Sequence, residues 1–209
     1  MNLKKSIYFV LGGPGSGKGA FCANIIAHNP ALFSHLSAGE LLRQFNRKDN
    51  PHNLSAIAKQ RYDIIEHCMH EGLIVPAEIT IGLILDEIDR SAHSKFLIDG
   101  FPRNKDNYNG WNKLSQEYKN IKLSKVVYLE CSESTMLNRI HRRAAESSQK
   151  RVDDNIEAFR KRMNTFLNET VPIVNIYDQQ GMLLHIDAEK SQAEMYEEFK
   201  KTKIIPELA

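Results

Sequence analysis

The sequence predicts an α/β protein whose parallel sheet is covered by helices on both faces. Three observations support this fold class: short apolar runs recur along the chain, segments of helical period separate them, and a glycine-rich stretch joins the first run to a helix. Short, fully apolar strands joined by helices are typical of a parallel sheet that is buried on both sides. The expected strands are Ile7–Leu11, Phe33–Leu36, Phe96–Ile98, Val126–Leu129 and Leu183–Ile186.

The glycine-rich stretch has the spacing of a phosphate-binding loop. Gly12-Gly-Pro-Gly-Ser-Gly-Lys18 matches the pattern G-x-x-x-x-G-K and precedes a helix-compatible run, Phe21–Ala27. Glycine allows the tight backbone in which successive N–H groups converge on one anion, and the following helix adds its positive dipole end. A plain glycine-rich turn is the alternative, but this spacing with a lysine favours nucleotide binding.

Length and composition bound the remaining possibilities. A chain of 209 residues with 42% hydrophobic and 26% charged residues is expected to form one globular domain. The formal net charge of +2 does not by itself predict a nucleic-acid partner. Three scattered cysteines, Cys22, Cys68 and Cys131, favour reduced thiols in a reducing compartment. No apolar run is long enough to cross a membrane, so we expect a cytoplasmic protein, with a nuclear location left open.

The segment after the second expected strand predicts helices around a polar loop. Ser37-Ala-Gly-Glu40 has the S-x-x-E signature of a helix start, and Arg43 follows one turn later, where a solvated side chain is the alternative to a ligand. Asn46–Asn53 is polar and interrupted by proline, so we expect a loop there. A helix is expected over Leu54–His70, and Pro76 stands near the start of the next one.

Two histidines on this helix raise the question of a metal site. His67 and His70 are three residues apart, with Cys68 and Glu71 nearby. The sequence shows no third ligand at a suitable spacing, and the helix is otherwise polar. We therefore expect solvent-facing histidines rather than a metal cluster.

A second informative stretch surrounds the third expected strand. A buried strand would deliver Asp99 at its carboxyl end, where open α/β sheets bind ligands. A carboxylate there can position hydrated Mg²⁺ next to phosphates, whereas capping of the next turn is the alternative. Arg103 follows a proline-fixed turn, which suits a bidentate phosphate contact.

The region from Arg139 to Arg162 is dense in cations around a polar segment, residues 144–150. A solvated face is the usual meaning of such a run, and a nucleic-acid site is another, but no aromatic residues alternate with these cations as a single-strand site requires. Beside a phosphate-binding loop, an arginine-bearing flap that closes over phosphates and excludes water explains them better. The sequence leaves two roles open for Tyr108 and Trp111, which are lining a base pocket and helix packing.

Five motifs together resemble the nucleoside monophosphate kinase (adenylate kinase) family, in the family's order, over most of the chain. The motifs are Gly12-Gly-Pro-Gly-Ser-Gly-Lys-Gly19, Leu36-Ser-Ala-Gly-Glu-Leu-Leu-Arg43, Glu71-Gly-Leu-Ile-Val-Pro76, Phe96-Leu-Ile-Asp-Gly-Phe-Pro-Arg-Asn104 and Arg151-Val-Asp-Asp154.

The resemblance implies a three-layer P-loop NTPase fold with a five-stranded parallel sheet in the order 2-3-1-4-5. One kinase domain would span residues 1–209, with a helical insert at about 37–73 that binds the monophosphate and a short lid at about 140–153 that closes on ATP. Members of the family transfer a phosphoryl group in line from Mg·ATP to the monophosphate, without a covalent intermediate. They are commonly monomeric, so a monomer is expected.

The resemblance also implies roles for individual residues. The expected ATP ligands are Gly15, Ser16, Gly17, Lys18, Gly19, Ala20, Arg143 and Lys190. The expected ligands of the monophosphate are Ser37, Arg43, Leu73, Ile74, Val75, Gly100, Arg103, Asn107, Arg151 and Arg162. The groups expected to act at the transferring phosphoryl group are Lys18, Arg103, Arg143, Arg151 and Arg162. Asp99 would hold Mg²⁺ through water.

The details resemble the pyrimidine-specific branch of the family, whose members phosphorylate CMP and UMP. Adenylate kinases usually carry Thr where this chain has Ala38, and a Gln downstream of the arginine that corresponds to Arg103. The Asn107 amide here offers both a donor and an acceptor, which suits uracil and cytosine alike. We expect CMP, UMP and dCMP as acceptors. Adenylate kinase activity and a non-catalytic nucleotide-binding module are the alternatives.

Three departures from the family pattern are visible. Ala20 stands where the family has Thr, so a hydroxyl contact to phosphate is missing. The insert carries extra residues around its polar loop. The lid is also slightly longer than usual, which leaves open whether Arg142 or Arg143 contacts ATP.

Overall fold

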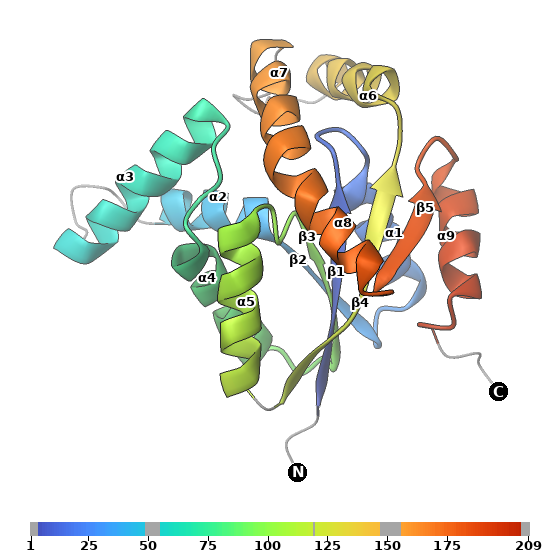
Figure 1. The fold of residues 1–209 in the computed structure, drawn as a ribbon, viewed down its shortest axis with the longest axis horizontal. Coiled ribbons are helices and arrows are strands. Elements are labelled where there is room, and N and C mark those ends of the chain that lie inside the picture. The colour runs from blue at the N-terminus through green and yellow to red at the C-terminus, as the bar shows by residue number, and fades with distance from the viewer. Residues whose placement is uncertain (1–3, 49–54, 119, 147–155, 206–209) are drawn as a thin grey trace.

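A five-stranded parallel sheet forms the centre of the computed structural model, which describes residues 4–48, 55–118, 120–146 and 156–205 (Figure 1). The strand order is β2-β3-β1-β4-β5, and every neighbouring pair is parallel. The predicted fold class and strand order are therefore confirmed. The strands are β1 (Lys5–Gly12), β2 (Phe33–Ser37), β3 (Lys95–Asp99), β4 (Ile121–Glu130) and β5 (Leu183–Asp187).

All five predicted strands are present, and β4 differs most from its predicted bounds. It begins at Ile121 rather than Val126, and its first residues pair with Lys5, Ser6 and Ile7 of β1. Ile121 is the one buried residue of the added stretch, residues 121–125, so no apolar run marks it in the sequence.

Helices follow the strands in the alternating pattern that the sequence predicts. The described α-helices are α1 (Lys18–His28), α2 (Ala38–Lys48), α3 (Ala56–Glu71), α4 (Ala77–Arg90), α5 (Lys105–Glu117), α6 (Glu133–Glu146), α7 (Ile156–Thr165), α8 (Val171–Gln179) and α9 (Gln192–Lys201). A π-helical segment, η2 (Phe166–Thr170), joins α7 to α8 without leaving helical backbone angles. None of the helices in the described ranges combines the length and apolar character needed to span a bilayer.

The predicted loop at Asn46–Asn53 is wrong at its beginning. Helix α2 continues to Lys48, so residues 46–48 are helical, while residues 49–53 lie outside the described part of the chain. Leu42 and Phe45 of α2 pack with Ile65 and Val75 in a small apolar cluster, which holds the helix through its last turn. Local polarity did not reveal this tertiary support.

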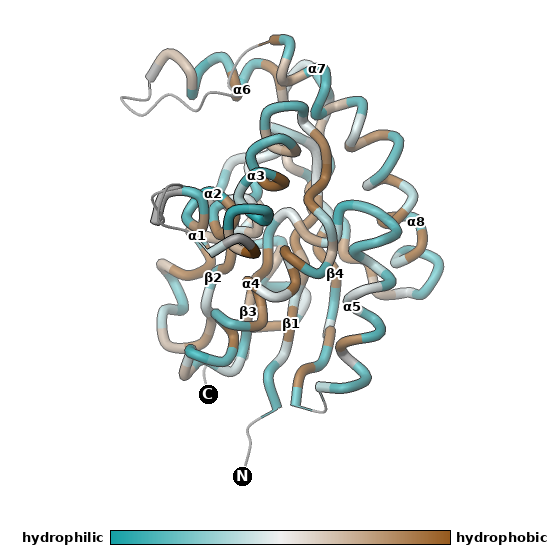
Figure 2. The backbone as a smooth tube through the Cα atoms, turned by 90° about the vertical axis from the view of Figure 1, so that its left-hand side faces the viewer, coloured by the Kyte–Doolittle hydropathy of each residue, from teal (hydrophilic) through white to brown (hydrophobic). Residues whose placement is uncertain are grey.

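The sheet is covered on both faces, because side chains of β1 alternate between two apolar clusters. Ile7, Phe9 and Leu11 pack with residues of α4, α5 and α8, whereas Tyr8 and Val10 pack with residues of α1 and α9. Figure 2 shows the central strands as largely hydrophobic, whereas the helices alternate between hydrophobic and hydrophilic positions. The result is the three-layer arrangement expected of a doubly covered parallel sheet.

Trp111 and Tyr108 belong to this packing and not to a base pocket. The Trp111 ring is buried, with its centroid 5.1 Å from that of Phe9. The Tyr108 ring packs edge-on against Tyr177 at 5.4 Å. Of the two alternatives left open by the sequence, helix packing is the one that the structure supports.

Two further apolar clusters form among helices that flank the sheet, and Figure 1 shows α3 and α6 on opposite sides of the molecule. One joins α2, α3 and α4 through Leu42, Ile65 and Ile79. The other joins α6, α7 and η2 through Met136, Phe159 and Phe166. Each flanking unit therefore has a small core of its own, separate from the cores of the sheet.

A substitution at Ile84 tests the importance of the α4 face. Ile84 is 0% exposed and packs in the cluster on the sheet, whereas Ile57 on α3 is 68% exposed. We expect Ile84→Ala to lower the free energy of unfolding by about 2–5 kcal/mol because it leaves a cavity. Denaturant unfolding measures this value, and Ile57→Ala is the matched control, with a change close to zero. Equal effects of the two variants would contradict the assignment of the core.

Candidate active site

A large cleft opens at the carboxyl ends of β1, β2 and β3, the edge where open α/β sheets bind ligands. Its volume is about 880 Å³. The loop after β1 forms its floor. The segment of residues 72–75 lines one side, and residues of α6 together with the β5–α9 connection line the other.

The glycine-rich loop after β1 is built around backbone that only glycine adopts easily. Gly15 has φ of +85°, and a Cβ atom there would lie 2.4 Å from the carbonyl oxygen of Met136. Gly17 has φ of +92° and forms the N-cap of α1. In the described structure no side chain caps this helix, and Lys18, Gly19 and Ala20 at its start line the cleft. Their N–H groups are therefore available to an anion.

Lys18 folds back over the loop. Its Nζ donates to the carbonyl oxygens of Gly12 at 2.8 Å and Gly13 at 2.9 Å, with Ser16 Oγ at 3.4 Å. The pKa of Lys18 is lowered to about 8, chiefly by burial; the charge of Asp99 opposes this shift and that of nearby Arg103 adds to it. A phosphate at this position would act as a counter-ion for the Lys18 ammonium group and would favour its charged form.

Arg103 and Arg162 approach the same place from different elements. Arg103 follows β3, and Arg162 lies on α7; both line the cleft. Burial, together with a smaller contribution from the charge of Arg162, lowers the pKa of Arg103 to about 10. Three cations, Lys18, Arg103 and Arg162, therefore share one partly desolvated region, which fits a polyanionic ligand.

Helix α7, which carries Arg162, and the π-helical segment η2 that follows it are tied to the cleft by threonine hydroxyls. Thr170 Oγ1, in η2, donates to the carbonyl oxygen of Arg103 at 2.7 Å. Thr165 Oγ1, at the end of α7, donates to the carbonyl oxygen of Gly72 at 3.0 Å. The continuous helical segment formed by α7 and η2 therefore contacts both the loop that holds Arg103 and the end of α3.

Asp99 ends β3 and is 7% exposed. His35 Nε2 lies 2.6 Å from Asp99 Oδ2, and Ser37 Oγ donates to Asp99 Oδ1 at 3.3 Å. These contacts fix the carboxylate beside the loop that holds Lys18. A carboxylate at this place suits Mg²⁺, a hard cation that prefers oxygen ligands and retains water. Ser37 therefore supports Asp99 from the end of β2, directly before α2 begins.

Asn107 is 1% exposed and lines the cleft from the first turn of α5. Its Oδ1 accepts a hydrogen bond from the backbone N–H of Arg103 at 3.2 Å, which fixes the orientation of the amide. In the described structure its Nδ2 is buried without a partner. A buried donor without a partner is costly, so a ligand acceptor at this place is favoured.

The remaining monophosphate residues predicted from the sequence lie on the same side. Leu73, Ile74 and Val75 line the cleft next to Asn107. Arg43 lines it from α2, where its Nε and Nη2 both lie 2.9 Å from Glu40 Oε2. The Arg43 guanidinium is therefore held at the cleft by Glu40 and is not freely solvated.

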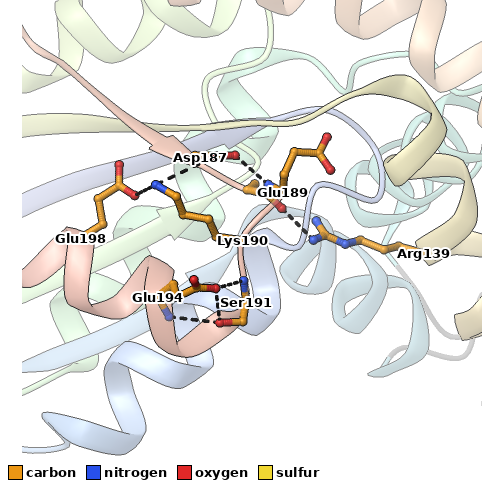
Figure 3. A network of polar contacts seen from close by, with 8 residues as sticks. Arg139, Asp187, Glu189, Lys190, Ser191, Glu194 and Glu198 are labelled. Atoms are coloured by element: carbon orange, nitrogen blue, oxygen red, sulfur yellow. Dashed lines mark hydrogen bonds and ion pairs between the residues drawn. The ribbon is translucent and has the colours of Figure 1, made fainter.

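The opposite end of the cleft carries a polar network (Figure 3). Arg139 Nη1 donates to the carbonyl oxygen of Ser16 at 3.2 Å, and its Nη2 donates to that of Ala188 at 2.7 Å. It therefore joins the glycine-rich loop to the β5–α9 connection. Lys190 lines the cleft, while its Nζ pairs with Glu198 at 2.9 Å, directed away from the glycine-rich loop.

Sequence reasoning missed several residues of this site, and three of them show why. Arg139 was recognised only as one cation among many, His35 was hidden inside a strand, and Gln192 gave no signal at all. Gln192 lines the cleft, and in the described structure its Oε1 is buried without a partner. Arg139 could have been found from its place one turn before Arg143, whereas the other two depend on chain-distant neighbours.

The structure brings nearly all of the predicted site residues together. The predicted residues that line the cleft are Gly15, Gly17, Lys18, Gly19, Ala20, Ser37, Arg43, Leu73, Ile74, Val75, Asp99, Gly100, Arg103, Asn107, Arg143, Arg162 and Lys190. Ser16 belongs to the same loop but is completely buried and does not line the cleft. Both Arg142 and Arg143 line the cleft, so the choice between them stays open. Arg151 lies outside the described residues.

The histidines of α3 are solvent-facing, as predicted. His67 and His70 are exposed, and His70 Nδ1 lies 2.7 Å from Glu71 Oε1. Within the described ranges, the one group of three potential metal ligands is Cys22, His35 and Asp99.

Comparisons with known proteins agree with this geometry. The family model described as adenylate kinase matches residues 10–182. The UMP-CMP kinase of Bos taurus is 41% identical over 204 residues, covering 95% of this chain and 97% of the relative. The UMP-CMP kinase of Homo sapiens is 41% identical over 201 residues, covering 94% and 95%. UMP-CMP kinase 3 of Oryza sativa subsp. japonica is 40% identical over 197 residues, covering 94% and 85%. The chain belongs to the adenylate kinase family of nucleoside monophosphate kinases.

Proposed function

We propose that this protein transfers the γ-phosphoryl group of Mg·ATP to CMP and UMP, and also to dCMP, giving the diphosphate and ADP. The observation that carries the proposal is the buried, unpartnered Nδ2 of Asn107 beside Arg103. In this proposal the Asn107 amide is the donor that reads the base, and Arg103 is the cation that binds the phosphate. The similarity to UMP-CMP kinases supports the same substrates.

The donor phosphates bind over the loop at Gly15–Ala20, where the N–H groups at the start of α1 and the Lys18 ammonium neutralise them. Lys18 exchanges its carbonyl contacts for the phosphates and follows the transferring group. Arg143 lies against ATP, and the backbone near Lys190 contacts the adenine. The missing hydroxyl at Ala20 removes one phosphate contact and leaves the backbone N–H groups in place.

The acceptor binds with its phosphate between Arg43 and Arg103, and with its ribose and base along Leu73–Val75. Asn107 Nδ2 donates to a base carbonyl. Asn107 Oδ1 already accepts a hydrogen bond from the backbone N–H of Arg103. This hydrogen bond therefore links the residue that recognises the base to a residue that binds the phosphate. Arg151 and Arg162 complete the positive charge at the point of transfer.

Catalysis rests on positioning and on charge neutralisation. The residues that fit Mg²⁺ are those around Asp99, which would orient its water ligands; when bound, the ion neutralises charge on the β- and γ-phosphates. The insert at about 37–73 and the lid at about 140–153 close over both substrates and exclude water. Leu42, Ile65 and Cys68 of the insert pack in an apolar cluster apart from those of the sheet, which supports movement of the insert as a unit.

The protein in this proposal is a monomer and acts without a nucleic-acid partner. It is located in the cytoplasm, with a nuclear location left open. The free thiols of Cys22, Cys68 and Cys131 support a reducing compartment.

An acceptor panel tests the function directly. With Mg·ATP, ADP production should be fast with CMP and UMP, measurable with dCMP and slow with AMP. Preference for AMP would mean that the base pocket is misassigned while the reaction is right. ATP binding without turnover of any acceptor would support a non-catalytic module and overturn the proposal.

Asn107→Ala tests base recognition. The variant loses the donor to the base, so kcat/KM for CMP and UMP should fall by about 10- to 100-fold, equivalent to roughly 1–3 kcal/mol. The KM for ATP should change little, because Asn107 lies at the acceptor end. Asn109→Ala, an exposed position on the same helix, is the control and should leave both constants unchanged. An equal loss for ATP and acceptor would argue against this role.

The pH dependence of ATP binding tests the role of Lys18. In the free protein the pKa of Lys18 is about 8, so above that pH the group is neutral and must take up a proton to bind phosphate. Affinity should be flat below pH 8 and fall by up to about tenfold per unit between pH 8 and 9. Calorimetry at pH 7, 8 and 9 measures it. Lys18→Met should bind more weakly at pH 7 and show no such decline; a flat profile for the unaltered protein would refute the role.

A further inference from the structure

Three side chains with different metal-binding atoms meet beneath the glycine-rich loop. Cys22 comes from α1, His35 from β2 and Asp99 from the end of β3. One ligand atom from each lies within 4.8 Å of the other two. Cys22 is completely buried and Asp99 nearly so, which distinguishes this group from the acidic clusters common on protein surfaces.

We propose that Cys22, His35 and Asp99 form a binding site for a thiophilic divalent cation, with Zn²⁺ as the best match. A thiolate, an imidazole and a carboxylate are the ligand types that Zn²⁺ takes in proteins, and three protein ligands with one water complete a tetrahedron. Mg²⁺ prefers oxygen ligands alone, so this site would select against it. The role is separate from any water-mediated contact of Asp99 with Mg²⁺.

The required movements are small. With bonds of about 2.0–2.3 Å, tetrahedral Zn²⁺ separates its ligand atoms by roughly 3.3–3.8 Å. His35 Nε2 and Asp99 Oδ2 are now 2.6 Å apart and must separate by about 1 Å, as the cation replaces the proton between them. Cys22 Sγ lies within 4.8 Å of the other two ligand atoms, so it must approach by at most about 1.5 Å. Asp99 lines the cleft, which provides access for the cation and room for its water ligand.

The charges balance when the metal binds. Burial, with a contribution from Asp99, raises the pKa of the Cys22 thiol, so the metal-free protein holds a neutral S–H group. Zn²⁺ displaces this proton to solvent and forms the Zn–S bond, while the ring proton of His35 moves from Nε2 to Nδ1. The thiolate and the Asp99 carboxylate together neutralise the cation, and one proton is released for each Zn²⁺ bound. The nearby Lys18 ammonium limits the affinity.

Occupancy would have a consequence for the reaction proposed above. A cation bound directly to Asp99 fixes the carboxylate that the proposed function assigns to the water ligands of Mg²⁺. Bound Zn²⁺ should therefore inhibit turnover. This consequence rests on the proposed function, whereas binding itself does not.

Metal binding to the complete, ligand-free protein tests the site without an activity assay. We expect one Zn²⁺ per chain by equilibrium dialysis, and with Cd²⁺ an ultraviolet thiolate charge-transfer band. Cys22→Ser should weaken Zn²⁺ binding at least tenfold and abolish the band. Cys131→Ser, which changes a half-buried cysteine outside the group, is the matched control and should retain both signals. No stoichiometric binding, or unchanged binding by Cys22→Ser, would overturn the proposal.

X-ray absorption at the zinc edge gives a second measurement that needs no variant, in case Cys22→Ser does not fold. One sulfur ligand with the remainder nitrogen or oxygen is expected for the unaltered protein. A zinc shell without sulfur, or with two sulfurs, would overturn the site. The acceptor panel is run separately without Zn²⁺, so failure of the kinase proposal and failure of the metal site are distinguished.

Discussion

Mutual repulsion among partly buried cations is the constraint on which the rest of the site depends. Lys18, Arg103 and Arg162 come from three elements and share one desolvated region, where Lys18 satisfies its donors with loop carbonyls. Such an arrangement is costly in the free protein and is relieved by a bound polyanion. The sheet makes it possible because parallel strands end at one edge and place their following residues side by side. The cation cluster is therefore held by the fold and completed by the ligand.

The supporting structure explains why these groups keep their places. Phe9 and its neighbours anchor β1 between two apolar layers, so the loop that follows starts from a fixed position. Asp99 is held by His35 and Ser37 of the adjacent strand, and the Asn107 amide by the backbone of Arg103. Each functional group thus has a partner that orients it, which is what positioning catalysis requires.

Much of the fold and site could be predicted because its signals are local. The apolar runs marked the strands, and the G-x-x-x-x-G-K spacing located the loop from a single stretch of chain. The start of β4 escaped prediction because its buried side chains are too few, and the last turn of α2 because distant residues support it. His35 and Gln192 have no local signature, since their importance comes from neighbours far along the chain. The family resemblance supplied roles that spacing alone could not give, and those roles remain predictions for the individual residues.

The π-helical segment η2 has a mechanical consequence. A π-turn contains one residue more than an α-turn, so η2 sets the rotation of α7, which carries Arg162, relative to α8. Deleting one residue here would return this helical segment to α-helical pitch and turn α7 by roughly 100° about its axis. Arg162 would then leave the cleft, although every apolar layer of the sheet stayed intact. The rotational phase of a single helix, and not only its packing, is therefore part of what specifies this site.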